Sequence, residues 1–276
     1  MKPSQITDLL NVIDDFLEMH ANAPESKDLD LVSLRDKLRA IHDEKASSLI
    51  PMIKNQRMRS KLLFGKERAK WFQDWTWSEE RMEIFKSIMK AHVNWEYPCM
   101  EVFPGTGDSL PHALAAEPLY IVDWEETLLD RVGKQFNDYY ATKRLMKYKI
   151  NEYDFSELPK NSFGFIYAVN WVRFEDITGL NNLALGLYDC LMPGGHLLMA
   201  YNPIDRAHGI QNTEEGYAAG ADTGQLRSAL ESIGFEIREI QNKIMPSYVL
   251  CKKPGEIEYI KAGSILAKII DRNQEV

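Results

Sequence analysis

Residues 101–110 read EVFPGTGDSL, and the interpretation of the whole chain begins from this stretch. Apolar Val102 and Phe103 run into a turn that holds Gly105 and Gly107, and a polar segment follows. Glycine has no side chain to keep a ligand away from the backbone. Ligands of open α/β sheets bind at the carboxyl ends of the strands, where this turn falls. The stretch suggests a nucleotide-binding turn, although glycine pairs also occur in strand-to-helix turns that bind nothing.

After Pro98, short apolar stretches alternate with amphipathic ones. The predicted strands are CMEVF (99–103), PLYIVDW (118–124), RLMKYKI (144–150), FGFIYAVN (163–170), GGHLLMAYN (194–202), FEIREIQ (235–241) and SYVLCKK (247–253). The predicted helices between them are SLPHALAA (109–116), EETLLDRVGKQFNDYYA (125–141), NNLALGLYDCLM (181–192) and TGQLRSALESIG (223–234). This alternation predicts an α/β fold with a seven-stranded, mainly parallel sheet covered by helices on both faces. The short gap around Pro246 predicts that the last two strands pair antiparallel.

The segment before this sheet has a different pattern, because its apolar residues recur at helical spacing. We expect residues 1–96 to form a helical region, with a helix that begins near Ser78, a residue suited to cap it. Residues 97–253 form the predicted sheet domain. Residues 254–276 form an amphipathic helical tail, which either packs back on the domain or joins a second subunit of a homo-oligomer.

The composition limits the classes of function. The 276 residues carry a formal net charge of -8, which argues against a protein that wraps nucleic acid, although it permits a local basic face. No apolar run approaches the roughly 18 residues that a membrane span needs. The three cysteines are scattered and predict neither a disulfide framework nor a metal cluster. A reducing, cytoplasmic compartment is the expectation.

Two acidic residues follow successive predicted strands. Asp123 ends the second strand, where a carboxylate can accept both hydroxyls of a ribose, and its alternative role is a helix N-cap. Asp154 and Phe155 follow the third strand, where they could meet an adenine amino group and ring face, and the alternative for Phe155 is the core. Such signals at three successive strand ends favour a nucleotide-containing ligand.

With these motifs, the sequence resembles the class I S-adenosylmethionine-dependent methyltransferases, most closely the small-molecule branch typified by quinone-biosynthesis enzymes. The resemblance covers roughly residues 97–253 and includes the turn LMPGGHLLMAYNP (191–203) and Asp154 four residues before Leu158-Pro159. It implies S-adenosylmethionine as cofactor and methyl transfer to a small molecule by in-line displacement. The cofactor-binding residues that it implies are Glu101, Phe103, Gly105, Gly107, Asp123, Trp124, Asp154, Phe155 and Asn170.

Two positions depart from this family's pattern. The family usually has glycine at position 103 and an acidic residue at position 164, whereas this chain has Phe103 and Gly164. A phenylalanine at the first of these positions is familiar from DNA methyltransferases, so it raises a nucleic-acid substrate as an alternative. The same departures motivate a third hypothesis, a methyltransferase-like protein that has lost catalysis and serves binding or assembly.

Residues after the fourth and fifth strands are the candidates for chemistry. Asn170 is predicted to bond the methionine part of the cofactor, and Trp171 and Arg173 to line the acceptor pocket. A carbon or hydroxyl acceptor needs a base, for which Tyr201, Asp205 and His208 are the weak candidates, with His208 expected in a polar loop. The Asp/Asn-Pro-Pro-aromatic signature of amino-group DNA methyltransferases is absent after the fourth strand, which favours a small-molecule acceptor.

A basic and aromatic segment, residues 54–77, leaves the substrate class open. Its Arg57 and Arg59 are candidate substrate-binding residues. Positive charge interleaved with aromatic rings can bind single-stranded nucleic acid, or it can be the solvated face of a helix whose aromatic residues are core. We expect it to act as a lid over the cofactor that helps to bind a small acceptor.

Overall fold

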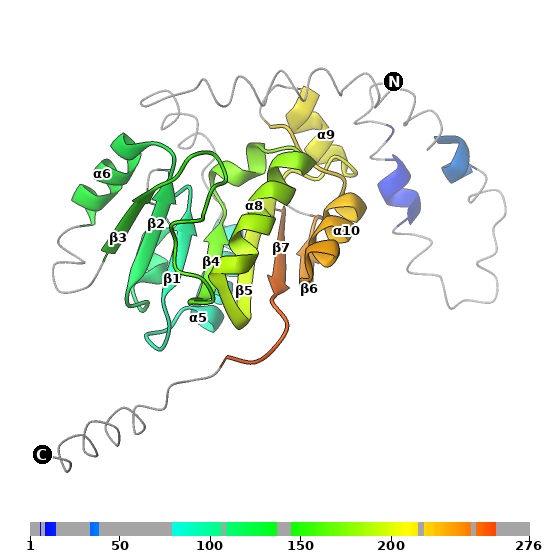
Figure 1. The fold of residues 1–276 in the computed structure, drawn as a ribbon. Coiled ribbons are helices and arrows are strands. Elements are labelled where there is room, and N and C mark those ends of the chain that lie inside the picture. Colours follow the sequence, from blue (N-terminus) through cyan, green and yellow to red (C-terminus); the bar gives the residue numbers. More distant parts are fainter. Residues whose placement is uncertain are drawn as a thin grey trace, which may run out of the picture.

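A seven-stranded sheet lies at the centre of the computed structural model, which describes residues 6, 9–14, 34–38, 79–105, 107, 109–136, 145–214, 218–243 and 247–257 (Figure 1). The order of the strands is β3-β2-β1-β4-β5-β7-β6. Their bounds are β1 Cys99–Val102, β2 Leu119–Asp123, β3 Leu145–Lys149, β4 Phe163–Ala168, β5 Leu191–Tyr201, β6 Glu236–Gln241 and β7 Ser247–Lys252. Six strands fall within the predicted stretches, and β5 begins three residues before its predicted start, over Leu191 and Met192, which were predicted as the end of a helix.

The pairing confirms the predicted topology. Strand β1 pairs parallel with β2 and with β4, and the parallel arrangement continues to β3 on one side and β5 on the other. Strand β7 runs antiparallel to both β5 and β6. From β1 the chain builds the sheet outward to β3 on one side, and from β4 it builds the sheet outward on the other side. The strand order therefore reverses between β1 and β4, which is the switch point where open α/β sheets bind their ligands.

Burial explains why the central strands read as continuous apolar runs. Every residue of β1 and of β4 is buried, because helices cover both faces of the sheet there. The edge strand β3 has half-buried and exposed residues but no fully buried one. The opposite edge, β6, carries exposed charges such as Glu236 and Glu239, which discourage pairing with another chain.

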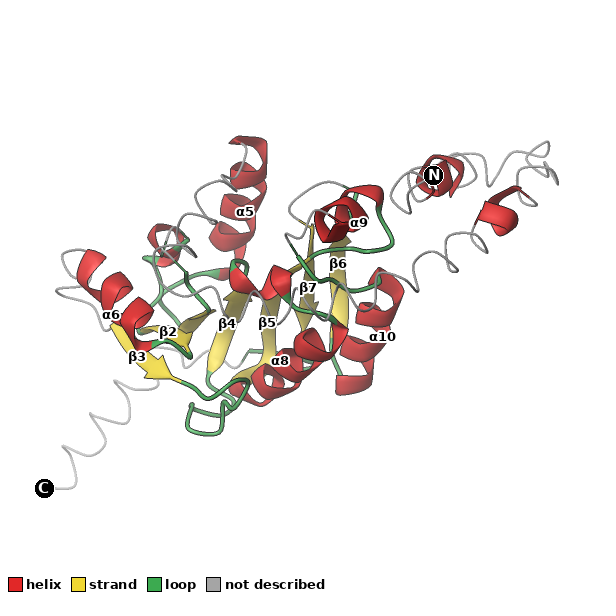
Figure 2. Cartoon of the chain, turned by 90° about the horizontal axis from the view of Figure 1, so that it is seen from above, coloured by secondary structure: helices red, strands yellow, loops and turns green. Residues whose placement is uncertain are grey.

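The helices form the outer layers of the fold. They are α5 Glu79–His92, α6 Glu126–Gln135, α8 Ile177–Cys190, α9 Ala207–Glu214 and α10 Thr223–Ile233, with short 3₁₀ turns η2 Leu110–Ala113 and η3 Trp171–Phe174. Figure 2 shows α5 on one side of the sheet and α8 and α10 on the other. Within the described part of the chain, no helix has the length and apolar character that crossing a membrane requires.

Two predictions of local structure are wrong. The helix expected over residues 109–116 is only the 3₁₀ turn η2, because Pro111 occupies its start and β2 begins at Leu119. The polar loop expected around His208 is instead helix α9, whose composition shows little apolar periodicity and which buries Ile210 completely. Of the predicted N-terminal helical region, the structure describes α5 and the helical residues 9–14 and 34–38.

Helix α5 packs on the sheet through aromatic and imidazole rings. His92 stacks on Phe165 of β4 with ring centroids 5.3 Å apart, and it lies 4.4 Å from the ring of His196 on β5. Phe85 meets Tyr167 of β4 edge to face at 6.4 Å. These contacts place the end of the N-terminal region directly over the centre of the sheet.

Tyr97 explains why position 164 carries no acid. Its hydroxyl donates to the His92 carbonyl at 2.6 Å, and its ring lies against Gly164 of β4. A Cβ atom at position 164 would come within 2.2 Å of the Tyr97 ring. The space that a side chain at 164 would need is therefore filled by Tyr97, and glycine is required there.

Candidate functional site

The carboxyl ends of β1, β2 and β4 bring three predicted site residues to one edge of the sheet. Phe103 follows β1, Asp123 ends β2, and Asn170 follows β4. Each is connected to a neighbouring strand or turn by hydrogen bonds described below. This edge is the candidate site.

The turn after β1 keeps the backbone shape of a glycine turn although it begins with a phenylalanine. The φ angles are +57° at Phe103, +60° at Gly105 and +84° at Gly107. The Phe103 N–H donates to the Val122 carbonyl at 2.7 Å, which fixes this unusual conformation against β2. A Cβ on Gly107 would lie 2.8 Å from the ring of Phe136, so this glycine permits close packing against the end of α6.

Glu101 ties the turn to β4. Its carboxylate is fully buried and accepts hydrogen bonds from the Ser109 hydroxyl and, at 3.0 Å, from the Tyr167 hydroxyl. The Asn170 amide lies 3.4 Å from Glu101 Oε1 and donates to the Pro104 carbonyl at 3.0 Å. Glu101 and Asn170 thus hold the turn through their side chains. The contributions of Ser109 and Tyr167 were missed, because only the fold brings them to Glu101.

Asp123 lies at the end of β2 with its carboxylate inside the protein. It is 0% exposed, and its Oδ1 accepts a hydrogen bond from the Glu125 N–H at 3.0 Å. The N-cap of α6 is Glu125, so Asp123 supports the turn before the helix rather than capping it. A carboxylate is an acceptor only, with about four lone-pair sites on its two oxygens.

Four rings, which we call the aromatic wall, surround the end of β2: Phe103, Trp124, Tyr153 and Trp171. Trp124 is the half-buried centre of this group. Its ring centroid lies 4.6 Å from that of Phe103, 5.7 Å from Trp171 at 82°, and 6.3 Å from Tyr153. The contacts with Trp171 and Tyr153 are edge to face, a geometry that stabilises aromatic pairs and fixes their orientation. Tyr153 was not predicted here, since the sequence gives no sign of its contact with Trp124.

Behind the aromatic wall lies a charged and buried segment. The indole Nε1 of Trp171 donates to Glu175 Oε1 at 3.3 Å, and Trp171 and Glu175 are both almost fully buried. Arg173 is 7% exposed, and burial lowers the pKa of its guanidinium to about 10. The structure therefore places Trp171 in the aromatic wall. Arg173, two residues later in the sequence, is buried inside the protein.

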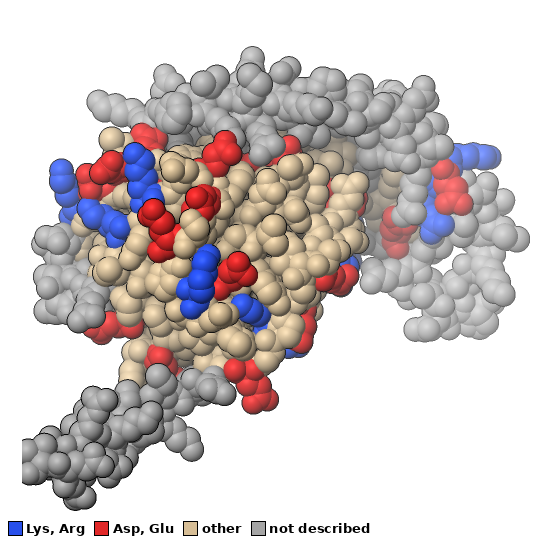
Figure 3. Space-filling model, viewed as in Figure 1, with Lys and Arg blue, Asp and Glu red and all other residues tan. Residues whose placement is uncertain are grey.

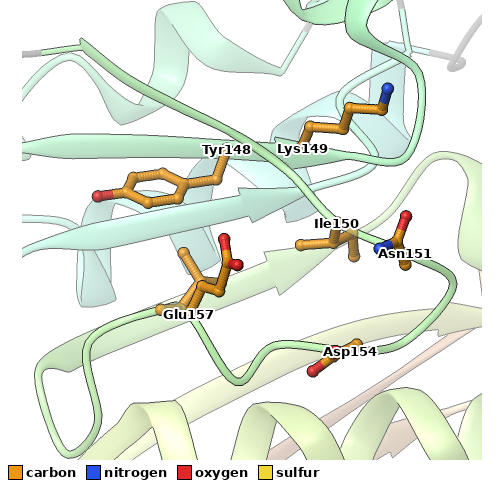
Figure 4. Close-up of a pocket in the computed structure, with 7 residues that line it drawn as sticks. Tyr148, Lys149, Ile150, Asn151, Asp154 and Glu157 are labelled. Atoms are coloured by element: carbon orange, nitrogen blue, oxygen red, sulfur yellow. The ribbon is translucent and has the colours of Figure 1, made fainter.

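Two predicted cofactor residues, Asp154 and Phe155, directly follow Tyr153 of the wall along the chain. Asp154 is exposed on the loop after β3, where its Oδ1 accepts from the Ser156 N–H at 2.9 Å. It lines a cavity of about 50 Å³ with Tyr148, Lys149 and Glu157 (Figure 4), which has room for water. Phe155 is buried in the core against Gly186 of α8.

The three candidate bases gather at the end of β5, but each has a structural partner. Asp205 accepts from the Thr223 N–H at 3.0 Å and from its hydroxyl at 2.7 Å, which supports the start of α10. Tyr201 shares a hydrogen bond of 2.9 Å with the same hydroxyl, and the His208 ring lies 3.3 Å from the Ser247 hydroxyl. Burial raises the pKa of Asp205 and of Tyr201. Arg57 and Arg59 lie outside the described residues.

Solved structures share the fold of this chain, while sequence comparison finds no relative. A Haloferax volcanii protein solved in complex with a methyltransferase activator is 12% identical and superposes with a TM-score of 0.54 over 68% of this chain and 95% of its own. The S-adenosylmethionine-dependent methyltransferase SibL is 14% identical, with a TM-score of 0.53 over 72% of this chain and 62% of its own. The chain has the fold of an S-adenosylmethionine-dependent methyltransferase.

At these identities the likeness concerns the methyltransferase fold alone. No protein-family model matches the sequence, and no curated protein sequence matches it. The side chains at the candidate site nevertheless fit S-adenosylmethionine. Asp123 offers a carboxylate suited to a ribose diol, and beside it Trp124 offers a ring suited to a purine face.

Proposed function

We propose that this chain binds S-adenosylmethionine and transfers its methyl group to a small-molecule acceptor by in-line displacement. The observation that carries the proposal is the buried Asp123 carboxylate next to Trp124, beside the glycine turn of β1. The methyltransferase strand order, with β1 at the switch point, supports the same assignment.

Each residue of the site has a separate task under this proposal. Asp123 accepts the ribose hydroxyls, and Trp124 covers the adenine ring. Gly105 and Gly107 have no side chain that would keep the cofactor away from the backbone, while Glu101 and Asn170 hold the turn in place through Ser109 and Pro104. The cofactor, when bound, supplies an electrophilic methyl group on a sulfonium. The protein then has to orient the acceptor in line and exclude water.

The acceptor would lie beyond the ends of β4 and β5. Trp171 lies after β4, and the three candidate bases Tyr201, Asp205 and His208 lie at the end of β5. An acceptor that must lose a proton needs a base at this place, and imidazole is the side chain that ordinarily exchanges protons near neutral pH. His208 is half-buried and close to Ser247, so it is the candidate to test first. Asp205 is committed to Thr223 and has the weaker claim.

Charge supports a small acceptor over nucleic acid. On the face drawn in Figure 3, acidic and basic side chains of the described residues intermix, and no continuous basic patch is formed by them there. The net charge of -8 acts in the same direction. The basic segment 54–77 lies outside the described residues, and its action as a lid remains part of the proposal.

The test combines binding with methyl transfer. Calorimetry should show that the protein binds S-adenosylmethionine, and methyl-labelled cofactor incubated with fractionated extract should label the small-molecule fraction. Asp130→Ala, which changes an exposed carboxylate on α6, is the matched control for Asp123→Ala. Label in nucleic acid would favour the alternative substrate class. Absence of binding would contradict the proposal and favour the non-catalytic hypothesis.

A further inference from the structure

We infer that Glu175 is a positioning residue that holds the Trp171 indole, and through it Trp124, in the orientation that the cofactor site needs. This inference rests on the proposed function, since Trp124 is the ring proposed to cover adenine. Glu175 is not among the site residues predicted from the sequence, because no sequence pattern marks the position that follows η3.

The first argument is the hydrogen bond between the carboxylate and the indole. Glu175 is 1% exposed, and its Oε1 accepts from Trp171 Nε1 at 3.3 Å. An indole has one donor, so this bond fixes which way the ring points. Trp171 in turn meets Trp124 edge to face, with 5.7 Å between centroids and 82° between planes. A change in the Trp171 ring therefore changes the support of Trp124.

The second argument is the place that the protein leaves for this carboxylate. Glu175 Oε2 lies against Gly179, in the first turn of α8, where a Cβ would come within 2.2 Å of it. The Tyr153 hydroxyl, from the aromatic wall, lies 3.0 Å from the same Cβ position. The start of a helix favours negative charge. Gly179 thus lets the carboxylate lie beside the helix start, between Trp171 and Tyr153.

Two substitutions separate positioning from general stability. Glu175→Ala removes the acceptor, whereas Glu175→Gln keeps an oxygen for the indole without the charge. Gly179→Ala leaves Glu175 in the chain but pushes its carboxylate out of this place, while alanine favours the helix itself. Glu231→Ala, at an exposed glutamate of α10, is the control for loss of a carboxylate elsewhere.

The readout is the far-ultraviolet circular dichroism couplet of two close indoles, measured on the full chain without cofactor. Its assignment comes from Trp124→Phe and Trp171→Phe, which should each abolish it. We expect Glu175→Ala and Gly179→Ala to lose most of the couplet while they retain a cooperative thermal transition, and Glu175→Gln and Glu231→Ala to retain the couplet. A couplet that survives both Glu175→Ala and Gly179→Ala would overturn the inference.

Cofactor affinity provides the second readout. The two disruptive variants should raise the Kd for S-adenosylmethionine about three- to ten-fold, the range that loss of one hydrogen-bonded support would produce. An unchanged Kd with a lost couplet would contradict the link from Trp171 to the cofactor. Wild-type protein that binds no cofactor would contradict the proposed function instead, and the couplet would still decide whether Glu175 positions Trp171.

Discussion

The rings of Phe103 and Trp124 lie 4.6 Å apart at the point where β1 and β2 end, and Phe103 makes this contact from a backbone φ of +57°. Left-handed backbone is unfavourable for a bulky residue, so the surrounding structure has to maintain it. Here the Phe103 N–H bond to Val122 and the buried ring contact do so. The turn keeps its glycine-like shape, and a phenylalanine ring joins the aromatic wall.

Phe103→Gly should lower the free energy of unfolding by about 2 to 4 kcal/mol. Loss of a buried aromatic ring costs about 3 to 5 kcal/mol, and glycine recovers roughly 1 kcal/mol by relieving the left-handed backbone. Urea denaturation measures this change, and calorimetry should give a Kd for S-adenosylmethionine at most about ten-fold higher, because the variant removes one of the rings that support Trp124. Much tighter binding by the glycine variant would show that the ring blocks the site, which favours the non-catalytic hypothesis.

Asp123→Ala should weaken the binding of S-adenosylmethionine about 100-fold or more. Two ribose hydroxyls would lose a charged acceptor, and each such bond contributes on the order of 1.5 to 3 kcal/mol. Titration calorimetry measures the effect against the Asp130→Ala control. Equal affinities in the two variants would remove Asp123 from the cofactor site.

Glu101→Ala should destabilise the protein by about 3 kcal/mol and loosen the turn. The substitution leaves the hydroxyls of Ser109 and Tyr167 buried without their acceptor. Chemical denaturation gives the stability, and exchange of the turn's amide protons reports its mobility. Glu101→Gln, which retains one accepting oxygen, should lose less. If both variants unfold like the unmutated protein, the network does not hold the turn.

The contact between His92 and His196 should make stability fall in acid. Burial lowers the pKa of both, and that of His196 falls to about 4 from an ordinary 6.5, with the charges of His92, Lys252 and Arg238 adding to the effect. Between pH 4 and pH 6.5 the unfolded chain binds more protons than the folded one. The contribution of His196 to the free energy of unfolding is therefore fully present above pH 6.5 and is lost as the pH falls toward 4.

Unfolding free energies measured across this range provide the check. His92→Phe with His196→Phe keeps an aromatic ring at each position but removes both titrating groups, so the double variant should show a shallower decrease than the unmutated protein. Carboxylates elsewhere contribute equally to both proteins. Identical slopes would mean that this histidine pair does not respond to acid.

The sheet could be predicted well from the sequence because each strand has a local signal. Seven apolar stretches separated by turn residues were enough to place every strand, and the antiparallel end followed from the short connection around Pro246. Helix α9 was predicted as a loop and the 3₁₀ turn η2 as a longer helix. A short helix without apolar periodicity leaves little signal in the sequence.

The candidate site was less visible, because tertiary contacts define it. Residues that follow strands, such as Phe103 and Asp123, could be named from the pattern. Tyr153 and Glu175 could not, since Tyr153 meets Trp124 from a loop distant in sequence and the bond from Trp171 to Glu175 exists only once η3 forms. Asp154 and Phe155 matched a family motif, yet the structure places one on an exposed loop and the other in the core.

The contact between Tyr97 and Gly164 has a consequence for how this chain diverged. A side chain at 164 and a ring at 97 compete for one volume, so neither position can change size alone without a steric clash or a void. Among homologous proteins, side-chain size at these two positions should vary inversely, with an acid at 164 accompanied by a small residue at 97. Ancestral sequences reconstructed along the lineage would show the two exchanges occurring close together in time.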